Sequence, residues 1–293
     1  MNETMRILIT GAKGNFPTAL IPLLEQEGHE LVLLDIEPMK SDSHKTVQAD
    51  IRDAGAVTAA MVGCSAVIHA MAYHGNMAGR SNYDDYYGVN VTGTHNILVA
   101  MLRLGIQDLV FSSSEVVYGE GMKGRLVMDE SAPCIPTHIY PLTKVLCEEM
   151  CRFYVRQHQF RIASLRYGCF VPEDWRVQGL GRLNNWLDRE DVADSNVLAL
   201  KAIIEGKIGY EEFLIHCSKP FVDSDWPKLR EEPEVVVERY FPGSTELLAR
   251  NGLKVPKVWH RFDISKAETM LGYSPKHNFA EFLERLRAEG VQG

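Results

Sequence analysis

The chain has 293 residues, of which 45% are hydrophobic and 24% are charged, and its formal net charge is -8. This composition is typical of a folded globular protein, and the negative charge disfavours nucleic acid or an anionic membrane surface as a partner. No apolar run approaches the roughly 20 residues that cross a bilayer, and no signal-peptide-like segment precedes the first apolar run. We therefore expect a cytoplasmic protein with no membrane partner.

Apolar runs alternate with helical stretches over the first half of the chain. The predicted strands are 5–10, 31–34, 66–68, 108–111 and 161–166, and the predicted helices are 18–24, 54–61, 83–104 and 142–157. Strands that are apolar throughout and separated by helices indicate a parallel sheet covered on both faces, which is an α/β fold of the Rossmann-type, doubly wound kind.

The alternation breaks after residue 166. Five prolines between 172 and 242 predict loops there, before a last helix at 279–288. We expect residues 1–166 to form a dinucleotide-binding Rossmann domain, with parts of 186–220 returning to it. Residues 167–293 are expected to form mainly a small C-terminal substrate-binding region.

The cysteine spacing indicates neither a disulfide framework nor a metal site. The six cysteines are Cys64, Cys134, Cys147, Cys151, Cys169 and Cys217. They form no Cys-x-x-Cys pair and no Cys/His cluster with the spacing of zinc ligands. We expect them to be reduced and structural, and we expect no metal ion.

A glycine-rich turn joins the first predicted strand to the first predicted helix. It reads Thr10-Gly11-Ala12-Lys13-Gly14-Asn15-Phe16-Pro17. The two glycines let the backbone turn sharply and approach a pyrophosphate, which then lies at the N-terminus of the helix. Pro17 replaces the usual third glycine, and proline is tolerated in the first turn of a helix. We expect Gly11, Gly14, Asn15 and Phe16 to contact a dinucleotide.

Asp35 ends the second predicted strand, about 20 residues after the turn, where a carboxylate can accept hydrogen bonds from both hydroxyls of the adenosine ribose. A carboxylate there repels a 2′-phosphate, so the sequence favours NAD over NADP. A solvated loop acid is the alternative interpretation of Asp35.

Tyr140 and Lys144 lie one helical turn apart, on one face of a predicted helix. A lysine cation stabilises phenolate, so we expect it to lower the pKa of Tyr140 and let the tyrosine exchange a proton with a substrate oxygen. Ser114 follows a predicted central strand, and its hydroxyl faces the crevice where such sheets bind ligands. Together these three residues predict a catalytic group.

These features resemble the extended short-chain dehydrogenase/reductase superfamily, in its NAD-dependent epimerase/dehydratase branch. The resemblance is carried in order by 10–14, 50–53, 67–72, 90–94, 111–114 with 117–119, 140–144 and 165–167, and more weakly by 263–267 and 271–275. It implies that Tyr140 is the general acid/base, that Lys144 tunes it and holds the nicotinamide ribose, and that Ser114 positions the substrate oxygen.

The resemblance also implies further cofactor contacts. Asp50 and Ile51 would flank the adenine, and Ala70, Met71 and Ala72 would lie along the ribose and phosphates. Asn90 would stand beside the nicotinamide, or else serve as a polar residue that kinks its helix.

Two departures from the family's usual sequence restrict the range of expected substrates. Dehydratases of the family carry Thr-Asp-Glu where this chain has Ser114-Glu115-Val116, so 4,6-dehydration is disfavoured, and Glu115 is either an exposed loop acid or a substrate-facing carboxylate. Only about 20 residues separate Arg166 from the next family segment, and this short stretch resembles that of uronate dehydrogenases, which oxidise a free sugar acid.

On that reading, one of two arginines, Arg176 or Arg182, meets a substrate carboxylate, because arginine binds carboxylates in a bidentate manner. His74 and Asn76, just after the fourth predicted strand, would reach substrate hydroxyls. Ordinary surface or loop polarity is the alternative for all four residues.

The leading hypothesis is an NAD-dependent dehydrogenase of a small sugar or sugar acid. A sugar epimerase that keeps NAD bound is the first alternative, and a non-catalytic NAD-sensing regulator is the second. The resemblance also implies a homodimer formed through the long helices that begin near Tyr83 and Leu142.

Overall fold

The computed structural model describes residues 4–74 and 82–290. Its strands are β1 (Arg6–Thr10), β2 (Glu30–Asp35), β3 (Lys45–Gln48), β4 (Ala66–His69), β5 (Asp108–Ser114), β6 (Val127–Met128), β7 (Arg161–Tyr167), β8 (Tyr210–Ile215) and β9 (Arg261–Phe262). Its α-helices are α1 (Pro17–Gln26), α2 (Ala54–Met61), α3 (Tyr83–Tyr86), α4 (Gly93–Leu104), α5 (Ile139–His158), α6 (Trp175–Gly181), α7 (Arg189–Ile204), α8 (Trp226–Glu231), α9 (Pro233–Tyr240), α10 (Ser244–Arg250), α11 (Ser265–Leu271) and α12 (Phe279–Gly290).

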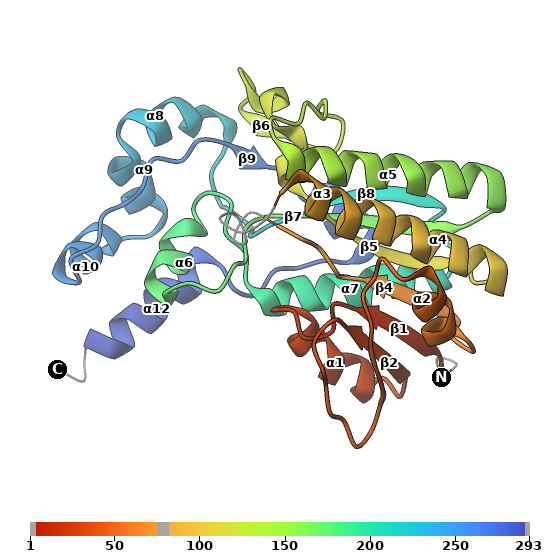
Figure 1. Ribbon diagram of the computed structural model, residues 1–293. Coiled ribbons are helices and arrows are strands. Elements are labelled where there is room, and N and C mark those ends of the chain that lie inside the picture. The colour runs from red at the N-terminus through yellow and green to blue at the C-terminus, as the bar shows by residue number, and fades with distance from the viewer. Residues whose placement is uncertain (1–3, 75–81, 291–293) are drawn as a thin grey trace.

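Seven parallel strands form the central sheet, in the order β3-β2-β1-β4-β5-β7-β8. Helices α2, α4 and α5 cover one face, and α1 and α7 cover the other, with α11 packed beside α7 (Figure 1). The predicted doubly wound α/β fold is confirmed. The order of the strands reverses between β1 and β4, and ligands of such sheets bind beyond the carboxyl ends of the strands at this point.

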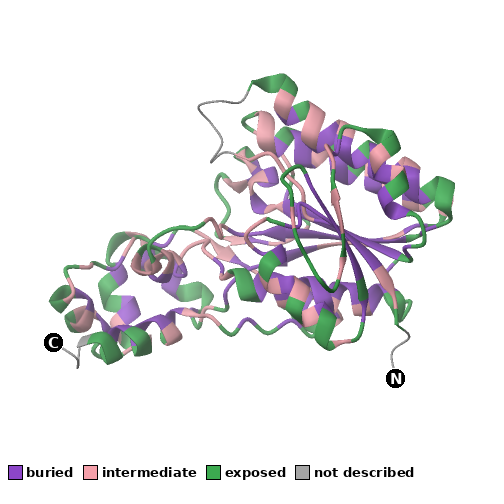
Figure 2. Ribbon diagram, turned by 60° about the horizontal axis from the view of Figure 1, so that its bottom comes forward, coloured by how far each residue is buried: buried purple, intermediate pink, exposed green. Residues whose placement is uncertain are grey.

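A smaller lobe extends from one end of the sheet and contains α6, α8, α9, α10 and α12 (Figures 1 and 2). It has its own apolar core, in which Trp226, Val237 and Phe282 are almost fully buried. The sequence predicted loops after residue 166, and this prediction is wrong for the smaller lobe. Pro227 and Pro233 lie in the first turns of α8 and α9, where a proline starts a helix instead of breaking it.

Chain segments from the second half return to the sheet. Helix α7 packs on one face, and β8 pairs with β7 as the last strand. The sequence did not predict β3 or β8, because β3 is short and partly exposed and β8 opens with Glu211 and Glu212. The division into 1–166 and 167–293 stays a prediction. Among the described residues no helix is both long and apolar enough to cross a membrane.

Candidate active site

The glycine turn packs closely against the backbone of the segment after β4 and has no room for a Cβ. Gly11 has φ +66°, and a Cβ built on it would lie 2.9 Å from the Cα of Met71. A Cβ on Gly14 would lie 2.9 Å from the carbonyl oxygen of Gly11. Helix α1 begins at Pro17, directly after the turn, so its N-terminal N–H groups lie beside the turn. This arrangement is compatible with a pyrophosphate, and the contacts of the turn with one stay a prediction.

Asp35 is buried at the carboxyl end of β2 and is not a solvated loop acid. Its carboxylate accepts hydrogen bonds from the backbone N–H groups of Lys13 and Glu37, both at 3.0 Å. These bonds hold the carboxylate beside the glycine turn, while the ammonium of Lys13 pairs with Glu37 at 2.5 Å. A fixed carboxylate in this place fits the two ribose hydroxyls of an adenosine.

His69 connects three parts of this site, and the sequence analysis missed it. Thr94 donates its hydroxyl proton to the carbonyl of Asn90 at 2.6 Å, so at 3.0 Å it accepts from Nε2 of His69. Nδ1 then accepts from the hydroxyl of Thr10 at 2.7 Å. This hydroxyl in turn accepts from the backbone N–H of Met71, so neutral His69 ties the predicted segment 70–72 to β1 and α4.

Burial, assisted by the charge of Lys144, lowers the pKa of His69 to about 3. The imidazole therefore stays neutral at ordinary pH. A buried histidine after an apolar strand carries no signal in the sequence beyond its polarity, which is why the role was not predicted.

Asn90 lies in a π-helical turn (Tyr87–Thr92) that interrupts the predicted helix 83–104. Its amide exchanges two hydrogen bonds with the backbone of Tyr73, at 2.7 and 3.0 Å, and donates to Thr143 at 2.9 Å. Such turns are frequent at functional sites. Asn90 therefore joins the segment after β4 to the first turn of α5, where Tyr140 and Lys144 stand.

Ser114, Tyr140 and Lys144 come together between the end of β5 and the start of α5. Ser114 lies close enough to Tyr140 to lower the pKa of its phenol. The ammonium of Lys144 donates to the carbonyl of Ser112 at 2.6 Å and lies 5.9 Å from the ring centroid of Tyr140. The three predicted catalytic residues thus form one cluster.

The expected lowering of the Tyr140 pKa is wrong for this arrangement. Burial raises the pKa of Tyr140 to about 12, against a smaller opposing effect of the Ser114 hydrogen bond. Burial also lowers the pKa of Lys144 to about 8. The ammonium is directed at Ser112 and not at the phenol, so its influence on the tyrosine does not outweigh desolvation.

The remaining predicted cofactor residues are held by local contacts. Ile51 is buried against Gly93, and a Cβ on this glycine would lie 2.8 Å from the Ile51 side chain. Asp50 pairs with Arg52 at 2.5 Å, and the hydrogen bond from this arginine lowers the pKa of Asp50. Asn15 donates to the carbonyl of Phe170 at 2.6 Å, while the ring of Phe16 is buried. Their contacts with a cofactor stay predictions, as do those of residues 70–72.

Glu115 is not the exposed loop acid that the sequence allowed, because it is 4% exposed. One carboxylate oxygen accepts from the side-chain amide of Asn185 at 2.5 Å, and the other lies 3.2 Å from Nε2 of His216. The imidazole of His216 stacks face to face on Phe262, with ring centroids 4.0 Å apart. Glu115 thus links the catalytic strand end to residues 185 and 262.

The two predicted arginines make ion pairs with other side chains. Arg176 pairs with Glu289 on α12 at 3.4 Å and lies over the ring of Trp175. Arg182 is buried between Asp188, at 2.9 Å, and Glu281, at 2.5 Å. The described contacts do not bring either guanidinium to Ser114 or Tyr140.

His74 and Asn76 were expected to meet substrate hydroxyls. His74 is partly buried, and its pKa is lowered by burial and by the charge of Lys144, which places it near the catalytic cluster. Asn76 lies outside the described residues.

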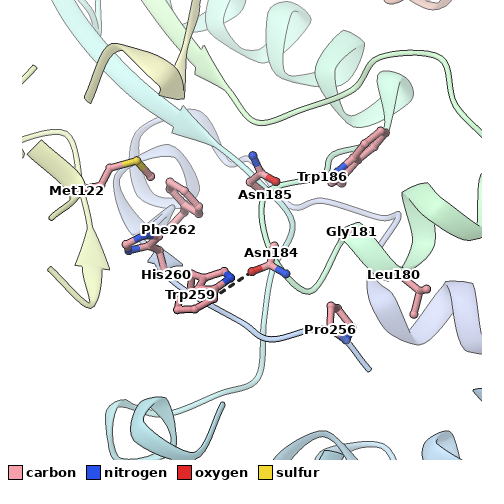
Figure 3. A pocket seen from close by; sticks show the side chains of 10 residues that line it. All are labelled: Met122, Leu180, Gly181, Asn184, Asn185, Trp186, Pro256, Trp259, His260 and Phe262. Atoms are coloured by element: carbon pink, nitrogen blue, oxygen red, sulfur yellow. Dashed lines mark hydrogen bonds between the residues drawn. The ribbon is translucent and has the colours of Figure 1, made fainter. Parts of the chain in front are cut away.

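A cavity of about 420 Å³ opens between the large and small lobes, within the size range of small-molecule sites. Three segments that are distant in the sequence line it (Figure 3). Its walls are mainly aromatic and amide side chains: Met122, Leu180, Gly181, Asn184, Asn185, Trp186, Pro256, Trp259, His260 and Phe262. Asn185 and Phe262 join this cavity to Glu115 and His216.

The Rossmann sheet carries a dinucleotide turn, an acid at the end of β2 and a Ser-Tyr-Lys cluster. Together these features define an oxidoreductase-type enzyme that uses a dinucleotide. Residues 7–173 match the NAD dependent epimerase/dehydratase family, and the chain belongs to this family. Its cofactor is NAD, and the tight turn at Gly11 and the fixed carboxylate of Asp35 fit that molecule.

Individual proteins with known names are also similar. A uronate dehydrogenase of Pseudomonas syringae pathovar tomato is 30% identical over 190 residues, which cover 64% of this chain and 66% of that enzyme. A UDP-glucose 4-epimerase of Halalkalibacterium halodurans is 31% identical over 56% of this chain and 50% of its own length. The chain thus matches just under two thirds of the length of the uronate dehydrogenase.

Among solved structures, a short-chain dehydrogenase/reductase superfamily protein from Agrobacterium tumefaciens with bound NAD has a TM-score of 0.75 at 21% identity. The match covers 98% of this chain and 97% of that one. This similarity shows the fold.

Proposed function

We propose that this chain is an NAD-dependent dehydrogenase that oxidises a hydroxyl carbon of a small sugar or sugar acid. The observation that carries the proposal is the proximity of Ser114 to Tyr140, with the ammonium of Lys144 within 5.9 Å of the phenol ring. The similarity to a uronate dehydrogenase and the short segment between β7 and α7 support a substrate without a nucleotide.

Each part of the site would contact a different part of the cofactor or substrate. The turn at Gly11 and Gly14 would hold the pyrophosphate, Asp35 the adenosine ribose, and Lys144 the nicotinamide ribose. When bound, NAD supplies the hydride acceptor and a positively charged ring. Ser114 and Tyr140 would both contact the reacting substrate oxygen, because Ser114 lies beside the phenol.

Tyr140 would take the proton of the substrate hydroxyl during oxidation and return it during reduction. With a pKa of about 12 the phenol is a ready proton donor, and oxidation needs the phenolate. Lys144 is the cation best placed to stabilise that phenolate, and a lysine with a pKa of about 8 is still largely charged at neutral pH.

The test is NADH formation at 340 nm with NAD and a panel of free uronic acids, aldoses and nucleotide sugars. Tyr140→Phe is expected to lower turnover by about 10²- to 10⁴-fold, the usual contribution of a general acid/base, without weakening NAD binding. Tyr154→Phe is the matched control, because this buried tyrosine lies on the same helix, about 21 Å further along. Unchanged turnover in Tyr140→Phe would show that the assigned chemistry is wrong.

Epimerisation is the second candidate, supported by the match to the UDP-glucose 4-epimerase. It predicts a change in sugar stereochemistry without net NADH. The same panel separates the two reactions when its products are analysed by NMR.

We also propose that the enzyme is a cytoplasmic homodimer. Apolar side chains are exposed along α4 and α5, among them Leu102, Leu142, Leu146 and Phe153, and the six cysteines are free thiols. Light scattering should give twice the mass of the chain, and Leu146→Glu should lower it to that of one chain.

A further inference from the structure

Lys219 lies behind the wall of the cavity, although no sequence motif pointed to it. It follows β8, and its ammonium donates a hydrogen bond to the backbone carbonyl of Asn184. The same nitrogen lies 5.5 Å from the ring centroid of Phe262. Asn184 and Phe262 both line the cavity (Figure 3). The ammonium therefore contacts two residues of the cavity wall.

The positive charge of Lys219 is only partly balanced by the protein. Within the described part of the chain, no carboxylate forms an ion pair with it. The nearby acid Glu115 is engaged by Asn185 and His216. Burial lowers the pKa of Lys219 to about 8, and the opposing effects of Cys217 and Glu115 do not cancel it. A buried ammonium in this state is stabilised when an anion arrives.

The two arginines that the sequence singled out are already paired with carboxylates. Arg182 is held by two carboxylates, and Arg176 pairs with Glu289 away from the cavity lining. His260 lines the cavity, and its Nδ1 lies 3.2 Å from the carbonyl of Arg125. Of the three hydrogen-bond donors on an ammonium, Lys219 directs one to the backbone carbonyl of Asn184.

We propose that Lys219 binds the carboxylate of a free sugar acid in this cavity and thereby determines the preference for uronates over neutral aldoses. The inference rests on the proposed dehydrogenase function and names its substrate class. The rings of Trp259 and Phe262 offer flat apolar surfaces for the C–H face of a sugar, and the amides of Asn184 and Asn185 offer donors and acceptors for hydroxyls.

The test compares pairs of sugars that differ only at C6: galacturonate with galactose, and glucuronate with glucose. Their binding to the NADH-loaded protein is measured by calorimetry, and NADH formation is measured in parallel. Lys219→Gln removes the charge and retains a side-chain donor for Asn184, and Lys219→Met removes both. Lys228→Gln on α8 is the matched control, because this lysine is exposed.

We expect both Lys219 variants to weaken uronate binding by about 10- to 150-fold, as when a hydrogen bond to a charged group is lost. Aldose binding should change less than three-fold, and the Lys228 control should match the parent protein. An equal loss for both sugars, no loss for uronate, or no uronate binding by the parent protein would overturn the inference.

The two proposals fail in different ways. Uronate binding that depends on Lys219, without any NADH formation, would refute the dehydrogenase and leave the carboxylate site standing. NADH formation from a uronate that is insensitive to both Lys219 variants would do the reverse.

Discussion

The ion pair of Glu148 and Arg166 lies directly beneath the catalytic cluster and should be sensitive to the loss of either partner. Arg166 donates two hydrogen bonds to the carboxylate, from Nε at 2.9 Å and from Nη2 at 2.7 Å. Ser113, the neighbour of Ser114, donates to the same carboxylate at 2.6 Å. The side chains of Glu148 and Arg166 are only 1% and 2% exposed.

Glu148→Gln should therefore leave the buried guanidinium of Arg166 with only the more distant carboxylate of Glu212, at 3.9 Å, as a counter-charge. Removing one partner of a buried pair costs about 3–5 kcal/mol of the free energy of unfolding. Glu149→Gln is the matched control one position along α5, because Glu149 is 58% exposed and its pair with Arg152 is worth at most about 1 kcal/mol. Urea denaturation at pH 7 measures both differences.

The double variant Glu148→Met with Arg166→Met should be more stable than Glu148→Met alone, because it leaves no unpaired charge. Equal losses of stability in Glu148→Gln and Glu149→Gln would show that the buried pair does not stabilise the fold more than an exposed one. Additive effects of the two methionine substitutions would show the same. Since Glu148 holds Ser113 and lies one turn after Lys144, turnover should also fall in Glu148→Gln while NAD binding is kept.

Three further predictions concern the cofactor end of the sheet. Gly11→Ala should weaken NAD binding strongly, because its Cβ would lie 2.9 Å from Met71. The control Gly28→Ala is also at positive φ (+81°) but has nothing within 4 Å, so it should leave NAD binding unchanged. Equal NAD titration curves for the two variants would contradict this prediction. Asp35→Asn should weaken NAD binding by about 1.5–3 kcal/mol in calorimetry, as expected for a lost hydrogen bond to a charged group. It should also reduce the difference in affinity between NAD and NADP. Tighter binding of NADP than NAD by the parent protein would refute the role of Asp35. The pKa of His69 is about 3 when folded and about 6.5 when unfolded, so the unfolded chain binds more protons between these values and stability falls as pH drops through 6.5. Between pH 7 and 5 this histidine should cost about 2 kcal/mol, and the pH dependence of urea unfolding should be smaller by that amount in His69→Gln.

The parts of the site that could be predicted lie in continuous motifs. The turn at Gly11, the acid at Asp35 and the helical spacing of Tyr140 and Lys144 are each set by neighbours within a few residues, and the parallel sheet then brings them to one edge. Spacing also predicts that Tyr140 and Lys144 share a helix face. It does not predict which oxygen the ammonium contacts, so the direction of the Tyr140 pKa was wrong.

The substrate side could not be predicted in the same way, because its cavity is assembled from residues near 122, 184 and 260. Helices of six to eight residues that begin with a proline show little hydrophobic periodicity. The sequence therefore did not predict the smaller lobe, which forms one wall of the cavity. Arginine was the expected cation because its geometry suits a carboxylate. In the fold, however, Arg182 is 8% exposed and serves as a buried link between Asp188 and Glu281.

A buried charge is expensive unless it is compensated, and this rule separates structural from functional cations better than residue type does. Arg166 and Arg182 each meet a carboxylate at close range, so their charges are accounted for within the fold. Lys219 instead meets a backbone carbonyl and an aromatic face, and its lowered pKa reflects that deficit. Because this ammonium lies directly behind the cavity wall, against Asn184 and Phe262, a negatively charged substrate in the cavity would supply the missing counter-charge. The comparison of uronates with aldoses measures this directly.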